Sequence, residues 1–204
     1  SKIGLRANLS GKEIAEQMLH DNQIYDVKVL HTSGMLTDHY NPQDKTINLS
    51  DDVYSGRSIS AAAVAAHECG HAVQHKIGYE MLKLRSAIVP LVNISSKISN
   101  WLILIGLGLM TGGGTNPSIL LIGIGLFSIT TLFTVITLPV EYDASHRAMA
   151  WLKQKQITVG SETDKAQDAL KWAARTYLVA AISSIATLIY YLLLFLNSRS
   201  SNNR

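Results

Sequence analysis

The sequence predicts a mainly α-helical integral membrane protein with a small β-sheet and about three transmembrane helices. Two observations carry this prediction: long apolar segments without charge in the second half, and an alanine-rich helix pattern in the first half. The composition agrees, because 47% of the 204 residues are hydrophobic and only 16% are charged. The net charge of +3 is too small to indicate a nucleic-acid partner. The single cysteine, Cys69, excludes an intramolecular disulfide.

Three segments are apolar enough to cross a lipid bilayer. Residues 118–138 and 177–196 contain no charged side chain. At 1.5 Å per helical residue, each can span a hydrocarbon core of about 30 Å. Residues 87–110 reach the same length, although they include Pro90, Asn93 and Lys97. The segment TGGGTNP at 111–117 is rich in turn-forming residues and is expected to join the first two crossings.

The number of crossings predicts which segments share a face of the membrane. Two crossings return the chain to its starting side, so residues 1–85 should face the same compartment as a helical segment at 140–175. The latter carries six Lys or Arg residues, which predicts the cytoplasmic side of the cell (inner) membrane. A transmembrane hairpin at 86–139 separates the two, and 176–204 forms a further transmembrane helix with a short tail.

The first part of the chain contains signals for both helices and strands. Ser10–Glu13 has the spacing of a capping box, followed by an amphipathic helix. Alternation of apolar and polar residues at 25–30 and 46–49 predicts a sheet of two or three strands. A longer helix is predicted between Ser58 as the N-cap and Gly78 as the C-terminal stop.

The longer helix carries an H-E-x-x-H motif. His67 and His71 are four residues apart, so their imidazoles lie on one face and can bind one tetrahedral Zn²⁺. Glu68 can then serve as the general base for a water molecule. His75 lies about 12 Å along the axis from His67, too far to share the ion. Such motifs also occur by chance on solvated helices, but here the neighbours are Ala and Val, which favours a metal site.

A hydrolytic zinc site needs a third protein ligand and an open position. A third histidine ten residues after the first is excluded, because that residue is Ile77. Glu141 follows the second apolar segment and is expected on the same side of the membrane as the two histidines. The alternative is a charged residue that only ends a membrane helix. Asp143 and His146 are candidates to orient a histidine or stabilise an oxyanion, and a solvated helix surface is equally compatible.

The H-E-x-x-H motif lies within the segment LSDDVYSGRSISAAAVAAHECGHAVQH. This segment is preceded by LTDHYNP and followed by PVEYDASHRA. In these three segments the chain resembles the YugP-type neutral zinc metallopeptidases, a family of bacterial membrane proteins. The resemblance implies Zn²⁺ on His67, His71 and Glu141, Glu68 as general base, and a protein or peptide substrate. Members usually begin with another membrane helix, which would lie before Ser1.

The chain is also similar, more distantly, to the HtpX-type membrane proteases. In that group an aspartate follows the third ligand by four residues, whereas this chain has Ser145 there and an acid at Asp143 instead. By analogy, a strand edge would pair with an extended substrate, and we expect that edge at Thr46, Ile47, Asn48 and Leu49. His39 precedes this strand and is a candidate to reach the site, with a role in stabilising the turn as the alternative.

These observations favour a membrane-embedded, zinc-dependent endopeptidase. The alternative is a non-catalytic membrane adaptor or chaperone in which zinc is a structural staple, with a fourth ligand from His39, His75 or His146. A small transporter is disfavoured, because Lys97 directly precedes the charge-free stretch 98–110 and has no matching buried acid.

Overall fold

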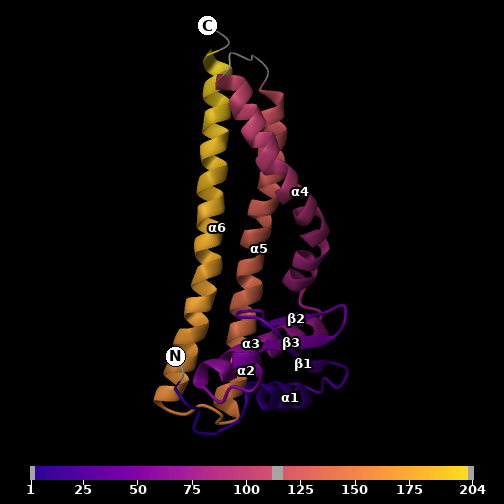
Figure 1. Cartoon of the computed structure of the whole chain (residues 1–204), viewed down its shortest axis with the longest axis vertical. Helices are drawn as coiled ribbons and strands as arrows, with labels where there is room; N and C mark the ends of the chain where they lie inside the picture. Colours follow the sequence, from indigo (N-terminus) through magenta and orange to yellow (C-terminus); the bar gives the residue numbers. More distant parts are fainter. Residues whose placement is uncertain (1–2, 112–116, 202–204) are drawn as a thin grey trace. The chain divides into compact units, whose positions relative to one another are not determined.

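The computed structural model describes residues 3–111 and 117–201, so the middle of the predicted turn, 112–116, lies outside the described residues. The predicted fold class is confirmed: the chain is mainly helical, with a small sheet and three helices long and apolar enough to cross a membrane. The elements in chain order (Figure 1) are α1 (Gly11–Asp21), β1 (Lys28–Thr32), β2 (His39–Asn41), β3 (Thr46–Ser50), α2 (Asp51–Tyr54), α3 (Ile59–Lys76), α4 (Glu80–Thr111), α5 (Ser118–Gln154) and α6 (Ser161–Ser201).

The chain divides into two compact units. We call the first the sheet unit; it comprises Ser1–Lys83 and Pro139–Thr176. The second, the helical unit, comprises Leu84–Leu138 and Tyr177–Arg204. Each of the three long helices therefore contributes residues to both units.

Local sequence signals set the helix boundaries in the sheet unit. The predicted capping box is present: the Ser10 hydroxyl accepts a hydrogen bond from the Glu13 N–H at 3.3 Å, and the Glu13 carboxylate accepts one from the Ser10 N–H at 2.7 Å. Ser58 caps α3 by accepting a hydrogen bond from the Ala61 N–H. Gly78 follows α3 with a φ of +67°, the left-handed conformation that glycine adopts most easily. These predictions are confirmed.

The sheet has the strand order β1-β3-β2, with β1 parallel and β2 antiparallel to β3. The expectation that Thr46–Leu49 forms an open edge is therefore wrong: this strand is the central one and is paired on both sides. Ile47 and Leu49 of this strand are fully buried. Alternation of apolar and polar residues identifies a strand but does not show how many strands pair with it. The hairpin of β2 and β3 uses one edge of β3, and its second edge is then free to pair with β1.

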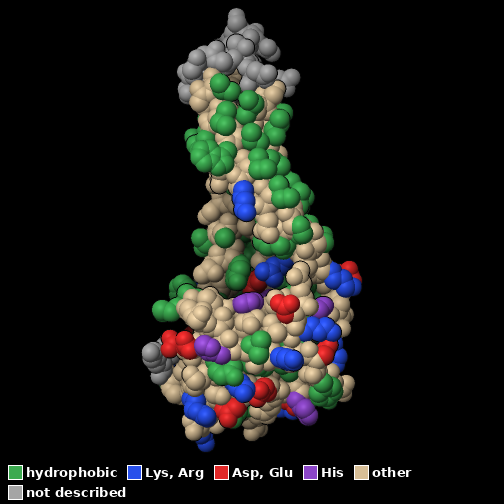
Figure 2. All heavy atoms as spheres, turned by 45° about the vertical axis from the view of Figure 1, so that its right-hand side comes forward, with side chains coloured by type: hydrophobic (Ala, Val, Ile, Leu, Met, Phe, Trp, Pro, Cys, Tyr) green, Lys and Arg blue, Asp and Glu red, His purple; other side chains and the backbone are tan. Residues whose placement is uncertain are grey.

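The helical unit exposes apolar side chains along its helices. Leu104 of α4 and Ile122 of α5 are both more than half exposed, and Figure 2 shows hydrophobic side chains over the visible face of this unit. Such exposure fits helices whose surroundings are hydrocarbon. Helix α5 does not end at Pro139 but continues to Gln154, since a proline within a helix removes only one backbone hydrogen-bond donor.

Candidate metal centre

The three predicted ligands meet within the sheet unit. His67 and His71 come from α3 and Glu141 from α5, and their ligand atoms all lie within 4.8 Å of one another. The Nε2 atoms of His67 and His71 are 3.2 and 3.7 Å from the Glu141 Oε2. Ligands of a tetrahedral zinc ion with bonds of about 2 Å are separated by about 3.3 Å. Two imidazoles and one carboxylate at these separations fit Zn²⁺.

Gly70 allows the two ligand-bearing helices to approach backbone to backbone. A Cβ atom at this position would lie 2.5 Å from the Ala144 carbonyl oxygen, closer than any normal contact. Ala144 lies three residues after Glu141, on the same side of α5. The glycine inside H-E-x-x-H therefore sets the distance at which Glu141 reaches the histidines. Sequence reasoning missed this role, although a glycine within a helix was the available signal.

Each histidine has a separate hydrogen-bond partner at Nδ1. The His67 Nδ1 lies 3.1 Å from the Ser145 hydroxyl, and the His71 Nδ1 lies 3.0 Å from the Gln74 Oε1. Such outer partners orient the ring of a metal-binding histidine. Ser145 is the fourth residue after Glu141, the position at which the HtpX-type proteases have an aspartate. Gln74 was not predicted at all, although it follows His71 by three residues on one helix face.

Asp143 and His146 have different surroundings. Asp143 accepts hydrogen bonds from the Gln74 Nε2 at 2.8 Å and from Arg147. It therefore contacts Gln74, the hydrogen-bond partner of His71, and not a histidine ring. His146 is exposed and lies outside the group of three ligands. It lines a separate cavity together with Tyr142 and other residues of α5 and α6.

Glu68 faces the strand β2 instead of joining the ligands. Its Oε2 accepts a hydrogen bond of 3.0 Å from the backbone N–H of Tyr40, and the residue is only 8% exposed. Strand β2 is an edge of the sheet, and the Tyr40 N–H points away from β3 to the Glu68 carboxylate. This carboxylate therefore occupies one backbone donor of the edge. This position, next to the histidines on α3 and bound to β2, is open to a proton-transfer role.

The remaining candidate histidines bind protein groups. His39 is exposed, with its Nδ1 2.7 Å from the Thr37 carbonyl oxygen and its Nε2 3.2 Å from the Asn48 amide. The His75 Nδ1 lies 2.7 Å from the Tyr40 hydroxyl. In the described ranges, neither belongs to the group of potential ligands.

Burial and nearby charges shift several pKa values at the site, among them those of His71, Tyr40 and Cys69. Burial lowers the pKa of His71, but hydrogen bonding to Glu141 and the charges of Glu68 and Glu141 outweigh this effect and raise the pKa above its usual value. Burial, together with Asp26, raises the pKa of Tyr40 to about 12. Burial and the charge of Glu68 raise the pKa of the Cys69 thiol well above its usual range. Cys69 is fully buried, as expected of a small core residue.

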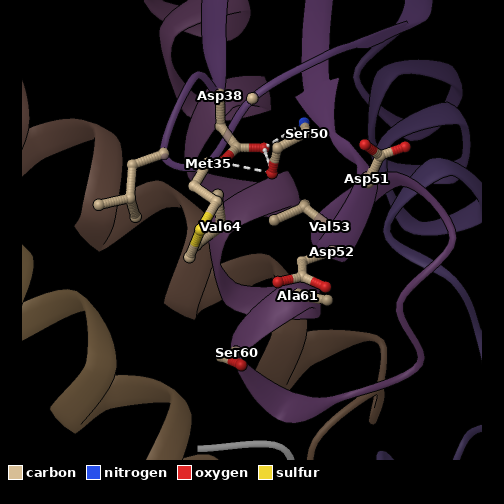
Figure 3. Close-up of a pocket in the computed structure, with 11 residues that line it drawn as sticks. Met35, Asp38, Ser50, Asp51, Asp52, Val53, Ser60, Ala61 and Val64 are labelled. Atoms are coloured by element: carbon tan, nitrogen blue, oxygen red, sulfur yellow. Dashed lines mark hydrogen bonds between the residues drawn. The ribbon is translucent and has the colours of Figure 1, made fainter.

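A cavity of about 470 Å³ lies along the N-terminal half of α3 (Figure 3). Val64 lines it and lies one helical turn before Glu68. Met35, from the loop before β2, lines it too and is 84% exposed. Asp38 fixes the end of this loop by accepting hydrogen bonds from the N–H and hydroxyl of Ser50. The cavity therefore combines aliphatic walls with carboxylates.

Two histidines on one helix and a carboxylate from a second helix, in a chain with three apolar helices, form an arrangement typical of membrane-bound zinc metallopeptidases. Comparison with known protein families and relatives agrees with this class. A model of the family described as "Putative neutral zinc metallopeptidase" matches residues 1–196, and the chain belongs to this family.

The chain is 41% identical to the "Putative membrane protease YugP" of Bacillus subtilis (strain 168). The alignment covers 99% of this chain and 88% of that relative. No solved structure matches.

Proposed function

We propose that this protein is a membrane-embedded endopeptidase that hydrolyses peptide bonds at a zinc site on the cytoplasmic side of the cell membrane. The observation that carries the proposal is the convergence of His67, His71 and Glu141 at distances that fit a tetrahedral ion. The membrane protease name of the relative, the three apolar helices and the basic residues at 140–175 support the location.

The residues of the chain have distinct roles in the proposed reaction. The imidazoles of His67 and His71 and the carboxylate of Glu141 would hold the ion. Bound zinc supplies a Lewis acid that polarises a carbonyl and lowers the pKa of water. Glu68 takes the proton from the attacking water at its carboxylate and returns it to the leaving amine. Its hydrogen bond to the Tyr40 N–H keeps the carboxylate turned toward β2.

We place the substrate on β2 rather than on β3. Strand β2 is an edge of the sheet, and Tyr40 within it contacts Glu68 directly. An extended peptide that pairs with the backbone groups of this edge other than the Tyr40 N–H would have its backbone next to the proposed base. The cavity lined by Val64 and Met35 follows along α3, where a side chain of such a peptide can enter.

The adaptor alternative requires a fourth protein ligand to close the zinc site. In the residues that the structure describes, His67, His71 and Glu141 form a group of three, and the three histidines considered for the fourth position lie outside it. The geometry therefore favours the catalytic function.

The test is to replace Glu68→Gln and measure peptide-bond cleavage and bound zinc in the full-length protein in detergent. Cleavage should fall by at least about 1,000-fold, about the size of a lost proton-transfer group, while bound zinc stays at one ion per chain. The matched control is Glu16→Gln on the surface of α1, whose carboxylate pairs only with Lys12 in the described contacts. A fully active Glu68→Gln protein, or a wild type that binds no zinc, contradicts the proposal.

A further inference from the structure

Gln74 is a completely buried amide that connects both ligand-bearing helices. Its exposed fraction is 0%. Its Oε1 lies 3.0 Å from the His71 Nδ1, and its Nε2 donates hydrogen bonds of 2.8 Å to the Val140 carbonyl oxygen and of 2.8 Å to Asp143. Val140 directly precedes Glu141 in the chain. One side chain of α3 therefore binds a ligand on its own helix and the backbone next to the ligand on α5.

The surroundings leave only one orientation for this amide. A backbone carbonyl oxygen accepts hydrogen bonds and cannot donate them, and the same is true of an ionised carboxylate. Arg147 donates from its Nε and Nη2 to the Asp143 carboxylate at 2.6 and 3.2 Å, which favours the ionised form. Both neighbours of the Nε2 are thus acceptors, so the NH₂ group of Gln74 must face them. The Oε1 is consequently the atom that faces His71.

This orientation determines which nitrogen of His71 carries a proton. The Gln74 Oε1 has no hydrogen to donate, so a hydrogen bond between it and the His71 Nδ1 requires the proton on Nδ1. The lone pair of a neutral ring is then on Nε2, the atom that faces Glu141. Ser145 exerts no such constraint on His67, because a hydroxyl can donate or accept.

We infer that Gln74 is a positioning residue for the metal centre: held by Val140 and Asp143, its amide fixes His71 in the tautomer and ring orientation that presents Nε2 to the ion. The inference rests on the proposed zinc site. The chain Arg147, Asp143, Gln74, His71 is its physical basis, and it assigns to Asp143 an effect on the metal that acts through Gln74.

The test measures zinc affinity by competition with a chromophoric chelator, together with the absorption spectrum of the Co²⁺-substituted protein. Replacing Gln74→Met keeps the side-chain length and removes the amide. It should weaken zinc binding about 10- to 100-fold, the usual effect of losing such a partner, and change the Co²⁺ spectrum. The matched control is Gln154→Met at the exposed end of α5, which should leave both unchanged. Unfolding of the metal-free protein reports separately on packing.

A pair of variants tests the hydrogen-bond chain itself. Gln74→Glu puts two carboxylates side by side and should also weaken zinc binding. Adding Asp143→Asn replaces one of them with an amide donor and should restore at least about 10-fold of the loss, if the loss is about 100-fold.

Two outcomes overturn the inference. One is a Gln74→Met protein whose zinc affinity and Co²⁺ spectrum match the wild type, even if its metal-free form unfolds more easily, because Gln74 would then serve packing alone. The other is a double variant that binds no more tightly than Gln74→Glu. Failure of the wild type to bind zinc would instead contradict the proposed function.

Discussion

In both units of this chain, a glycine allows two helices to pack closely, although the side chains around the two contacts differ in burial. In the sheet unit, Gly70 brings α3 against Ala144 of α5. In the helical unit, Gly106 brings α4 against Leu120 of α5, where a Cβ would lie 2.7 Å from the Leu120 Cα. Around the first contact the side chains are buried, whereas the helical unit exposes large apolar side chains. Close backbone contact is therefore independent of what surrounds a unit.

The difference lies in what each contact positions. The Gly70 contact holds a buried polar group, since Glu68, His71, Gln74 and Glu141 are each at most 8% exposed. The Gly106 contact holds an apolar cluster that includes Ile103, Leu120 and Ile124. Displacing helices by a fraction of an ångström costs packing in the apolar cluster, but in the polar group it also breaks ligand geometry.

The largest expected effect in this comparison is that of Gly70→Ala. The new Cβ must push α3 away from α5, so zinc affinity should fall by at least 100-fold, and the unfolding free energy should fall by about 1–3 kcal/mol despite the better helix propensity of alanine. Metal content after dialysis and thermal unfolding measure the two effects. Unchanged zinc binding would show that this glycine does not position Glu141.

A smaller effect is expected for Gly106→Ala in the helical unit. The substitution should lower the unfolding temperature in detergent, with a loss of about 1 kcal/mol, and leave zinc affinity unchanged. Gly108→Ala is the matched control, because a Cβ there has nothing within 4 Å; it should be neutral or slightly stabilising. Equal unfolding temperatures for the two variants would contradict a close helix contact at Gly106.

The smallest expected effect is the pH dependence of the metal-free sheet unit within the intact chain. The pKa of His71 is higher in the folded than in the unfolded protein. Its contribution to stability is therefore complete below the unfolded pKa of about 6.5 and is lost as the pH rises through the folded value. Zinc reverses this trend, because an imidazole must be neutral to bind it.

Thermal unfolding at pH 6 and pH 8.5, with and without chelator, checks this prediction. The replacement His71→Gln should flatten the dependence of the chelated protein. A chelated wild type that becomes more stable between these two pH values would contradict the assigned sign, provided that the His71→Gln protein does not show the same rise.

Local patterns predicted much of the fold. The capping box at Ser10, the N-cap at Ser58 and the stop at Gly78 depend on residues close in sequence, so their signals were sufficient. The short helix α2 was missed, because four residues carry too little periodicity. The pairing of β3 on both sides was missed as well, since the position of β1 depends on the packing of distant residues.

Side-chain chemistry and helical periodicity were enough to predict the candidate ligands, their spacing along one helix and the apolar segments. Three relations became visible only in the folded chain: Ser145 contacts His67, Gln74 joins His71 to α5, and β2 is the edge strand next to Glu68. These relations depend on how closely two helices and a sheet approach one another, and that distance results from the packing of many residues, Gly70 among them, rather than from any local pattern.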